Sequence, residues 1–339
     1  MRDLKGKTIA IVGGAGFIGH NMALTMKACG ADVHVIDGLN VNSMLFLYSH
    51  DCPLEERKFY RNVITSRLDL LEEAEIPLHI LDARDYHAIS RTLTSIKPQV
   101  IVHLAAVSHA NRSNKDPYST FDHSLRTLEN TLDWTRGSKL ERYVYYSSSM
   151  VYGNFESGIV DEETVCNPLG IYGALKFSGE KMVMAYNQVF DLPYTIIRPS
   201  ALYGERCISR RVNQIFIEKA FQGETIQING DGSDKLDFTY IQDLIDGTIL
   251  AMDKEEGKNE IFNITFGGAR SLAEVVEILK GYFEKMNVEY LPKDKLMPDR
   301  GTLSVEKAKS VLGYESQYPI EVGLERYIDW YKSLYKKNS

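Results

Sequence analysis

Tyr172 and Lys176 stand four residues apart in the stretch IYGALK, residues 171–176. If this stretch is helical, the two side chains share one face and are close enough to interact. A free phenol has a pKa of about 10, so Tyr172 alone would be a poor base at neutral pH. A fixed positive charge nearby favours the phenolate and lowers that pKa. The pair could therefore be a general base and its activator, or an ordinary surface pair in a chain that contains 20 Tyr.

A second candidate site is the glycine-rich stretch IVGGAGFIG, in which Gly13, Gly16 and Gly19 form G-x-x-G-x-x-G. In such a loop the first Gly permits a tight turn, the second lets the backbone approach a pyrophosphate, and the third permits close helix–strand packing. Asp37 is the acidic partner expected about 20 residues further on. Its carboxylate can accept the adenosine ribose hydroxyls and would repel a 2′-phosphate. The pattern therefore predicts NAD rather than NADP, with a ligand-free connector as the alternative.

A third candidate is the row of hydroxyls at Ser147, Ser148 and Ser149, which ends a predicted strand at 142–149. Open α/β sheets bind their ligands beyond the carboxyl ends of the strands, so these side chains could meet a ligand. Serines at a strand end can also simply cap a turn or the next helix. The residue types alone leave both interpretations open.

The elements that must position these residues alternate along the first half of the chain. Short, nearly continuous apolar runs predict strands that are buried on both faces. The predicted strands are 8–14, 32–37, 77–83, 99–106, 142–149 and 193–199, and the predicted helices are 17–29, 85–96, 118–136 and 172–190. This alternation predicts an α/β fold with a Rossmann-type, doubly wound parallel sheet. The segment 38–76 is expected to be a long irregular loop with one short helix near 65–75.

The pattern changes after about residue 200, where helices at 210–223, 271–286 and 320–337 and a strand entering the turn at 225–234 are expected. We therefore predict an NAD-binding domain over residues 1–200, to which 237–266 returns. The segments 201–236 and 267–339 are expected to form a smaller C-terminal α/β lobe that binds the substrate.

Composition limits the class of protein. Of the 339 residues, 44% are hydrophobic and 25% are charged, as in ordinary globular proteins. The net charge of −7 argues against nucleic acid or an anionic membrane as the main partner. The four cysteines lack metal-ligand spacing, so no metal site is predicted. With no signal peptide and no membrane-spanning apolar run, a cytoplasmic protein is expected.

Glycine loop, acidic partner, strand-end serines and Tyr-x-x-x-Lys occur in this order, and the order resembles the short-chain dehydrogenase/reductase superfamily. The run SSSMVYG, residues 147–153, and the chain length narrow the resemblance to the extended branch, the NAD-dependent nucleotide-sugar epimerases and dehydratases. The resemblance implies that Ser148, Tyr172 and Lys176 are catalytic. Tyr172 would take a proton from a sugar hydroxyl, and Lys176 would hold the nicotinamide ribose and favour the phenolate.

The resemblance also implies which residues contact NAD and which contact the substrate, a nucleotide-diphosphate sugar. Besides Tyr172 and Lys176, the implied cofactor contacts are Gly13, Gly16, Phe17, Ile18, Asp37, Asn40, Asp82, Ala83, Leu104, Ala105 and Ala106. The candidates for substrate contacts are Ser108, His109, Ser149, Arg206, Arg210, Arg211 and Arg300. Arginine suits a diphosphate through its planar fork. For each of these residues, plain packing or a solvated surface position is the alternative.

Two positions after Ser148 bear on the reaction. Related dehydratases carry Asp-Glu where this chain has Ser149 and Met150. Neither residue can protonate a leaving hydroxyl, so 4,6-dehydration is disfavoured and epimerisation, usually at C4, is favoured. A net dehydrogenase or ketoreductase and a non-catalytic NAD-binding scaffold are the alternatives.

Three positions differ from the family's pattern, because Ala201, Leu236 and Ser124 stand where the family usually has Asn, Arg and Asn. The identity of the sugar is therefore not predicted. The resemblance also implies a homodimer that joins through a four-helix seam made of the helices near 118–136 and 172–190.

Overall fold

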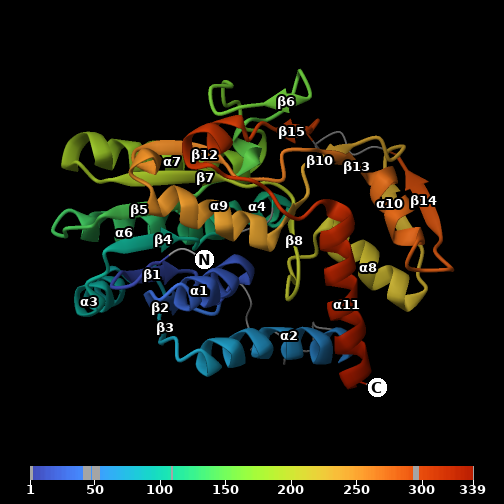
Figure 1. The fold of residues 1–339 in the computed structure, drawn as a ribbon, viewed down its shortest axis with the longest axis horizontal. Coiled ribbons are helices and arrows are strands. Elements are labelled where there is room, and N and C mark those ends of the chain that lie inside the picture. The colour runs from blue at the N-terminus through green and yellow to red at the C-terminus, as the bar shows by residue number, and fades with distance from the viewer. Residues whose placement is uncertain (1–2, 41–46, 48–53, 108–109, 293–297, 339) are drawn as a thin grey trace.

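The computed structural model describes residues 3–40, 47, 54–107, 110–292 and 298–338. Its centre is a seven-stranded sheet in the order β12-β7-β5-β4-β1-β2-β3, in which all neighbouring strands run parallel. The strands are β1 (Thr8–Val12), β2 (Asp32–Asp37), β3 (Leu78–Ile80), β4 (Val100–His103), β5 (Arg142–Tyr146), β7 (Tyr194–Arg198) and β12 (Glu260–Asn263). Helices cover both faces of this sheet (Figure 1). The predicted doubly wound α/β fold is confirmed.

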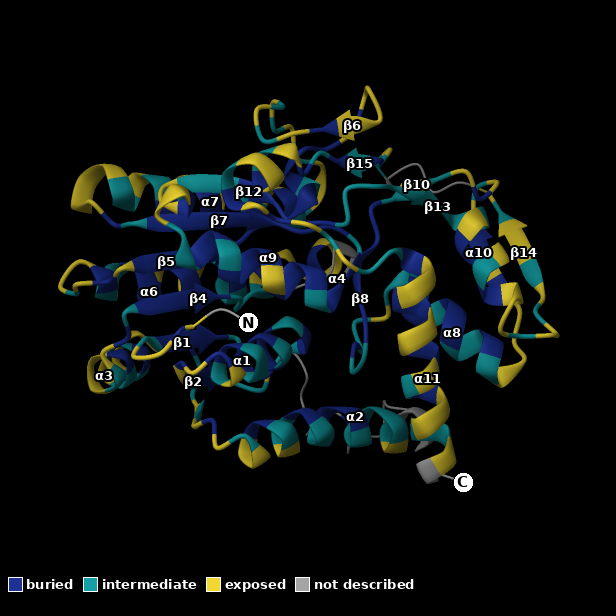
Figure 2. Ribbon diagram, in the orientation of Figure 1, coloured by how far each residue is buried: buried dark blue, intermediate teal, exposed yellow. Residues whose placement is uncertain are grey.

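Successive residues of β1 explain why the sheet needs cover on both sides. Ile9 and Ile11 belong to one buried apolar cluster, and Ala10 and Val12 belong to another. Side chains alternate across a strand, so a strand that is apolar at every position must be buried on both faces. The covering helices are α1 (Phe17–Ala28) and α9 (Ile241–Asp253) on the first face, and α3 (Tyr86–Ile96), α6 (Thr127–Thr135) and α7 (Gly170–Phe190) on the second. The central strands β1, β4, β5 and β7 are accordingly almost entirely buried in Figure 2.

The segment 38–76 differs from the sequence prediction. In place of a short helix near 65–75, the structure has the 20-residue helix α2, Leu54–Glu73. Tertiary packing stabilises its first half, because Phe59 stacks on Tyr331 and Tyr335 of α11 (Ile320–Asn338), with ring centroids 5.9 and 5.8 Å apart. The helix lies apart from the sheet and meets α11 beside it (Figure 1). The prediction was wrong because the partner rings lie far away in sequence.

The helix expected at 118–136 consists of three pieces. They are α5 (Pro117–Phe121), a π-helical turn over Asp122–Arg126, and α6. A short helix, α4 (Ala110–Lys115), precedes them. A π-helical turn inside an α-helix is rare and is found mostly at functional sites.

The rest of the chain forms smaller elements outside the seven-stranded sheet. The helices are α8 (Val212–Gln222) and α10 (Leu272–Lys280). The paired strands are β9 (Ile226–Asn229) with β14 (Val288–Leu291), β8 (Leu202–Tyr203) with β11 (Thr239–Tyr240), β10 (Lys235–Leu236) with β13 (Arg270–Ser271), and β6 (Ile159–Val160) with β15 (Thr302–Leu303). One-turn or π-helical segments lie at Ser149–Val151, Glu255–Gly257 and Ala308–Leu312. The segment 237–266 carries α9 and β12, whereas the division into two lobes remains a prediction.

Within the described ranges, no helix is both long enough and apolar enough to cross a lipid bilayer.

Candidate active site

The glycine loop between β1 and α1 has the geometry of a phosphate cradle. Gly13 has a φ of 83°, and a Cβ there would lie 2.7 Å from the backbone nitrogen of Ala105. A Cβ on Gly19 would lie 2.5 Å from the Cα of Gly14, so this position needs glycine for packing. At Gly16 the protein leaves more room, since the nearest atom would be 3.3 Å away. Gly16 begins α1 without a side-chain cap, so its bare backbone and the helix N-terminus are open to an anionic ligand.

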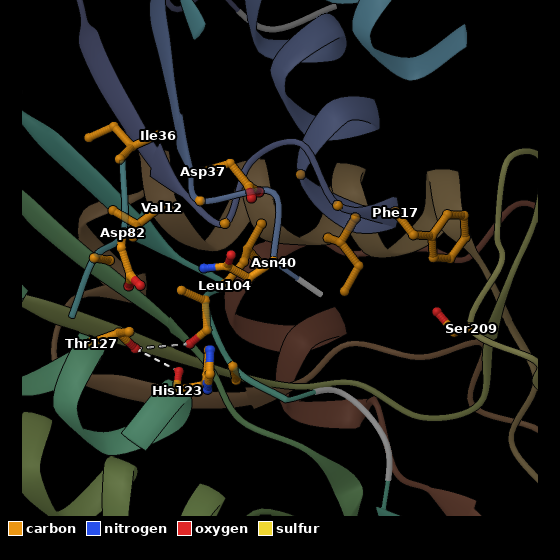
Figure 3. A pocket seen from close by; sticks show the side chains of 18 of the residues that line it. Val12, Phe17, Ile36, Asp37, Asn40, Asp82, Leu104, His123, Thr127 and Ser209 are labelled. Atoms are coloured by element: carbon orange, nitrogen blue, oxygen red, sulfur yellow. Dashed lines mark hydrogen bonds between the residues drawn. The ribbon is translucent and has the colours of Figure 1, made fainter. Parts of the chain in front are cut away.

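A pocket lies over this loop at the carboxyl ends of β1, β2 and β4 (Figure 3). Every non-catalytic position predicted to contact the cofactor lines it: Gly13, Gly16, Phe17, Ile18, Asp37, Asn40, Asp82, Ala83, Leu104, Ala105 and Ala106. The other lining residues were not predicted as cofactor contacts, and they are Val12, Gly19, Ile36, Gly38, Arg67, His123, Thr127, Ser209 and Arg211. Of these, His123 lies in the π-helical turn and Thr127 directly follows it, so this turn borders the pocket.

Asp37 is held in place by the backbone on both sides of the pocket. Its Oδ2 accepts a hydrogen bond from the N–H of Ala15 at 2.9 Å, and its Oδ1 accepts one from Leu39 at 2.8 Å. Burial raises the pKa of Asp37, and these two donors partly offset the rise. The carboxylate is thus fixed at the end of β2, where it faces the pocket (Figure 3).

We expect Asp37→Ala to weaken NAD binding by about 10–100-fold, because a charged hydrogen-bond acceptor contributes about 1.5–3 kcal/mol. Isothermal titration calorimetry with NAD measures the change. Asp32→Ala is the matched control, since Asp32 is an exposed carboxylate at the start of the same strand. Equal NAD affinity in the two variants would contradict the role given to Asp37.

Arg67 is the residue of this pocket that the sequence concealed most completely. It lies on α2, is 1% exposed, and donates from both Nε and Nη2 to the carbonyl oxygen of Arg206. Its Nη1 has no hydrogen-bond partner. Burial lowers the pKa of Arg67 to about 10, and the Asp37 carboxylate partly opposes this. A buried donor without a partner is costly, so a ligand oxygen in the pocket would satisfy it.

We expect Arg67→Met to weaken NAD binding by about tenfold while the stability of the cofactor-free protein is retained, since an incompletely bonded buried cation gives way to an apolar side chain. NAD calorimetry and urea unfolding measure the two effects separately. Lys58→Met, an exposed position on the same helix, is the control. Unchanged NAD affinity would leave Arg67 with a purely structural role.

Helix α7 carries Tyr172, Lys176 and Glu180 at intervals of four, so the three side chains share one face. Close packing fixes the helix against the sheet. A Cβ on Gly179 would lie 2.1 Å from the hydroxyl of Tyr145, and one on Gly173 would lie 2.7 Å from the carbonyl of Met150. The backbone of α7 therefore approaches the end of β5 as closely as two glycines allow.

The phenol of Tyr172 is partly buried and lies close to the side chain of Ser148. Burial raises the pKa of Tyr172, whereas Arg211, Ser148 and Arg300 act to lower it. Tyr172 and Ser148 therefore lie close together. Arg211, which lines the pocket over the glycine loop, connects this pair with that pocket.

Lys176 makes two contacts with β5 and its carboxyl end. Its Nζ donates to the carbonyl oxygen of Tyr146 at 2.7 Å and lies 5.3 Å from the ring centroid of Tyr145. Burial lowers the pKa of Lys176 to about 8, and Glu180 opposes the decrease. The positive charges that lower the pKa of Tyr172 here are Arg211 and Arg300, so the activator role assigned to Lys176 remains a prediction.

The three serines after β5 have three different partners. Ser147 donates to Glu180 Oε1 at 2.5 Å, and Ser149 accepts from Nη2 of Arg300. Ser148 accepts from the N–H of Met150 at 3.2 Å, and its side chain lies close enough to Tyr172 to lower the pKa of that phenol. Of the three serines, Ser148 is therefore the one that acts on Tyr172, and it is also the serine that the resemblance marks as catalytic.

The remaining substrate candidates lie in different places. Arg206 donates to Nε2 of His20 on α1 at 3.0 Å, and Arg210 lies 3.3 Å from the hydroxyl of Tyr60 on α2, so both arginines face the cofactor-side helices. Ser108 and His109 lie outside the described residues. Among the residues that the structure describes, no three His, Cys, Asp or Glu side chains are grouped as metal ligands.

Comparison with known proteins places these features in a family. Residues 9–265 match the NAD dependent epimerase/dehydratase family. The chain belongs to this family. A relative named putative UDP-glucose 4-epimerase, from Methanocaldococcus jannaschii, is 28% identical over 331 residues, which are 96% of this chain and 98% of the relative.

Solved structures agree with this assignment. UDP-glucuronic acid 4-epimerase from Bacillus cereus, in complex with UDP-glucuronic acid and NAD, has a TM-score of 0.84 and 27% identity and covers 97% of this chain and 100% of its own. UDP-glucose 4-epimerase from Thermotoga maritima, with UDP-glucose, has a TM-score of 0.83 and 25% identity and covers 96% and 99%. The predicted family and the predicted cofactor, NAD, are confirmed.

Proposed function

We propose that this chain is an NAD-dependent epimerase that inverts C4 of a nucleotide-diphosphate sugar. The observation that carries the proposal is the proximity of Ser148, Arg211 and Arg300 to the phenol of Tyr172, with Arg211 also lining the pocket over the glycine loop. A scaffold that only bound NAD would not need a phenol with a serine and two arginines acting on it at this place. The epimerases among its relatives and structural neighbours support the same reaction.

In this mechanism NAD supplies the acceptor and later the donor of a hydride. Tyr172 takes the proton of the sugar hydroxyl at C4, and Ser148 donates a hydrogen bond to the same oxygen. The ketosugar then rotates so that its opposite face meets the cofactor. Tyr172 returns the proton to the C4 oxygen, and C4 now has the opposite configuration. Lys176 is proposed to hold the nicotinamide ribose.

The neighbours of Ser148 favour epimerisation over dehydration. Ser149 is bonded to Arg300, and Met150 Sδ lies 2.7 Å from Nη1 of Arg300. Neither side chain can act as the acid that would expel a hydroxyl from the sugar. Without such an acid, return of the hydride to the other face is the simplest outcome.

We further propose a cytoplasmic homodimer that joins through α5–α6 and α7. Support comes from large apolar side chains that these helices expose, namely Tyr118, Phe121, Val189 and Phe190. An assembly that covers them would remove apolar surface from water. The described cysteines, Cys29, Cys166 and Cys207, are free thiols, as expected in a reducing compartment.

The deciding experiment incubates the NAD-loaded protein with one nucleotide sugar and follows both the epimer ratio and the absorbance at 340 nm. An epimerase produces the second epimer without net NADH. Stoichiometric NADH would instead indicate a dehydrogenase and would overturn the proposal.

A further inference from the structure

The feature of the site that C4 chemistry leaves unexplained is the guanidinium of Arg300, which comes from the segment before β15. It contacts the hydroxyls of Ser149 and Ser200, the second at 3.4 Å, and lies over the ring of Phe155 at 5.2 Å. Its Nε has no hydrogen-bond partner. In the described part of the chain, no carboxylate forms an ion pair with it.

A buried cation without a counter-ion is unfavourable. Burial lowers the pKa of Arg300 to about 10, and Asp237 acts against this decrease. Asp237 is already committed, because its carboxylate accepts hydrogen bonds from Leu303, Thr265 and Gly267. The side chain of Arg300 keeps some accessible surface, so an anionic ligand could reach it and supply the missing charge.

The position of Arg300 relative to Tyr172 indicates which part of a nucleotide sugar would meet it. Ser149 directly follows Ser148, whose side chain lies close to Tyr172, and Arg300 is near enough to lower the pKa of that phenol. Arg300 therefore lies at the C4 end of a bound sugar. In a six-membered sugar ring C1, which carries the diphosphate, is opposite C4, whereas C5 and its substituent C6 are next to C4.

Building on the proposed C4 epimerisation, we propose that Arg300, with Ser149 and Ser200, binds a carboxylate at C6, so that the substrates are nucleotide-linked hexuronates. The planar guanidinium matches a carboxylate in a two-point arrangement, and the serine hydroxyls can donate further hydrogen bonds to it. A neutral hydroxymethyl group at C6 would leave the half-buried cation without a counter-charge.

The test measures dissociation constants of UDP, UDP-glucose and UDP-glucuronate by calorimetry with the NAD-loaded Tyr172→Phe protein, which does not turn them over. We expect UDP-glucuronate to bind at least about tenfold more tightly than UDP-glucose. Adding Arg300→Gln should weaken the binding of UDP-glucuronate by about 10–100-fold and leave the binding of UDP and UDP-glucose nearly unchanged. Arg300→Lys should have an affinity for UDP-glucuronate between those of the parent protein and Arg300→Gln. Arg326→Gln is the control, because the guanidinium of Arg326 lies over Tyr318, and it should leave all three dissociation constants unchanged.

Equal weakening of UDP itself would assign Arg300 to the diphosphate and overturn the inference. If Arg300→Gln does not fold, the preference of the parent protein for the uronate decides alone, and equal affinity or no binding overturns the inference. Turnover by the unmutated enzyme separates the two proposals. If the enzyme epimerises UDP-glucose but not UDP-glucuronate, only the uronate inference is overturned. If NADH accumulates with either sugar, the proposed function is overturned.

Discussion

Tyr172→Phe is expected to reduce the rate of epimerisation by roughly 10²–10⁴-fold, the range that general acid–base catalysis contributes. The substitution removes one oxygen, and that oxygen is the proton acceptor in the proposed reaction. The side chain of Ser148 lies close to it, and the positive charges of Arg211 and Arg300 act on the phenol. NAD binding should be largely retained, because Tyr172 does not line the cofactor pocket that the described residues form. Steady-state epimer formation and NAD calorimetry measure the two quantities.

Tyr186→Phe is the matched control, since Tyr186 lies on the same helix and packs on Phe190 with ring centroids 5.3 Å apart. It should retain nearly full activity. A Tyr172→Phe enzyme that turned over at the rate of this control would remove the mechanism, because no other described residue is proposed to accept the proton. Loss of NAD binding in Tyr172→Phe would instead indicate a structural role.

Local pattern and short-range spacing were sufficient for the parts of the molecule that depend on neighbours in sequence. The apolar runs of β1 and β2 predicted a doubly covered parallel sheet, and the glycine spacing after β1 placed Gly13, Gly16 and Asp37 together at one pocket. Strand-end position indicated the serines, and i, i+4 spacing placed Tyr172 and Lys176 on one face of α7.

What the sequence could not reveal depends on partners far away along the chain. Arg67 looks like an ordinary helical surface residue, yet the carbonyl of Arg206 and the packing of α2 on α11 bury it at the cofactor pocket. The electrostatic environment of Tyr172 is similar, because two distant arginines act on it in addition to any effect of its neighbour Lys176. Such contacts have no local signal, since their spacing in sequence is set by the fold.

Glu180 is the third member of the functional face of α7, and its removal should cause a large loss of stability. Its carboxylate receives two hydrogen bonds from Arg198 of β7, at 2.8 and 2.9 Å, and one from Ser147, with both charged side chains buried. Burial by itself would lower the pKa of Arg198, and the Glu180 carboxylate more than offsets this and raises it. We expect Glu180→Ala to lower the free energy of unfolding by about 3–5 kcal/mol, because it leaves a buried guanidinium without its counter-charge. Urea unfolding of the NAD-free protein measures the change.

Two further variants separate charge imbalance from a general effect of removing a carboxylate. Glu277→Ala breaks the exposed pair with Lys280 and should cost less than about 1 kcal/mol. In Glu180→Leu combined with Arg198→Met, both charges are absent and apolar side chains of similar size fill the space, so much of the stability should return. A loss in Glu180→Ala no greater than in Glu277→Ala would show that the ion pair does not hold α7 on the sheet. Tyr172, Lys176 and Glu180 share one face of α7. If the double variant recovers stability but not epimerase activity, the Glu180–Arg198 pair also orients the face that carries Tyr172.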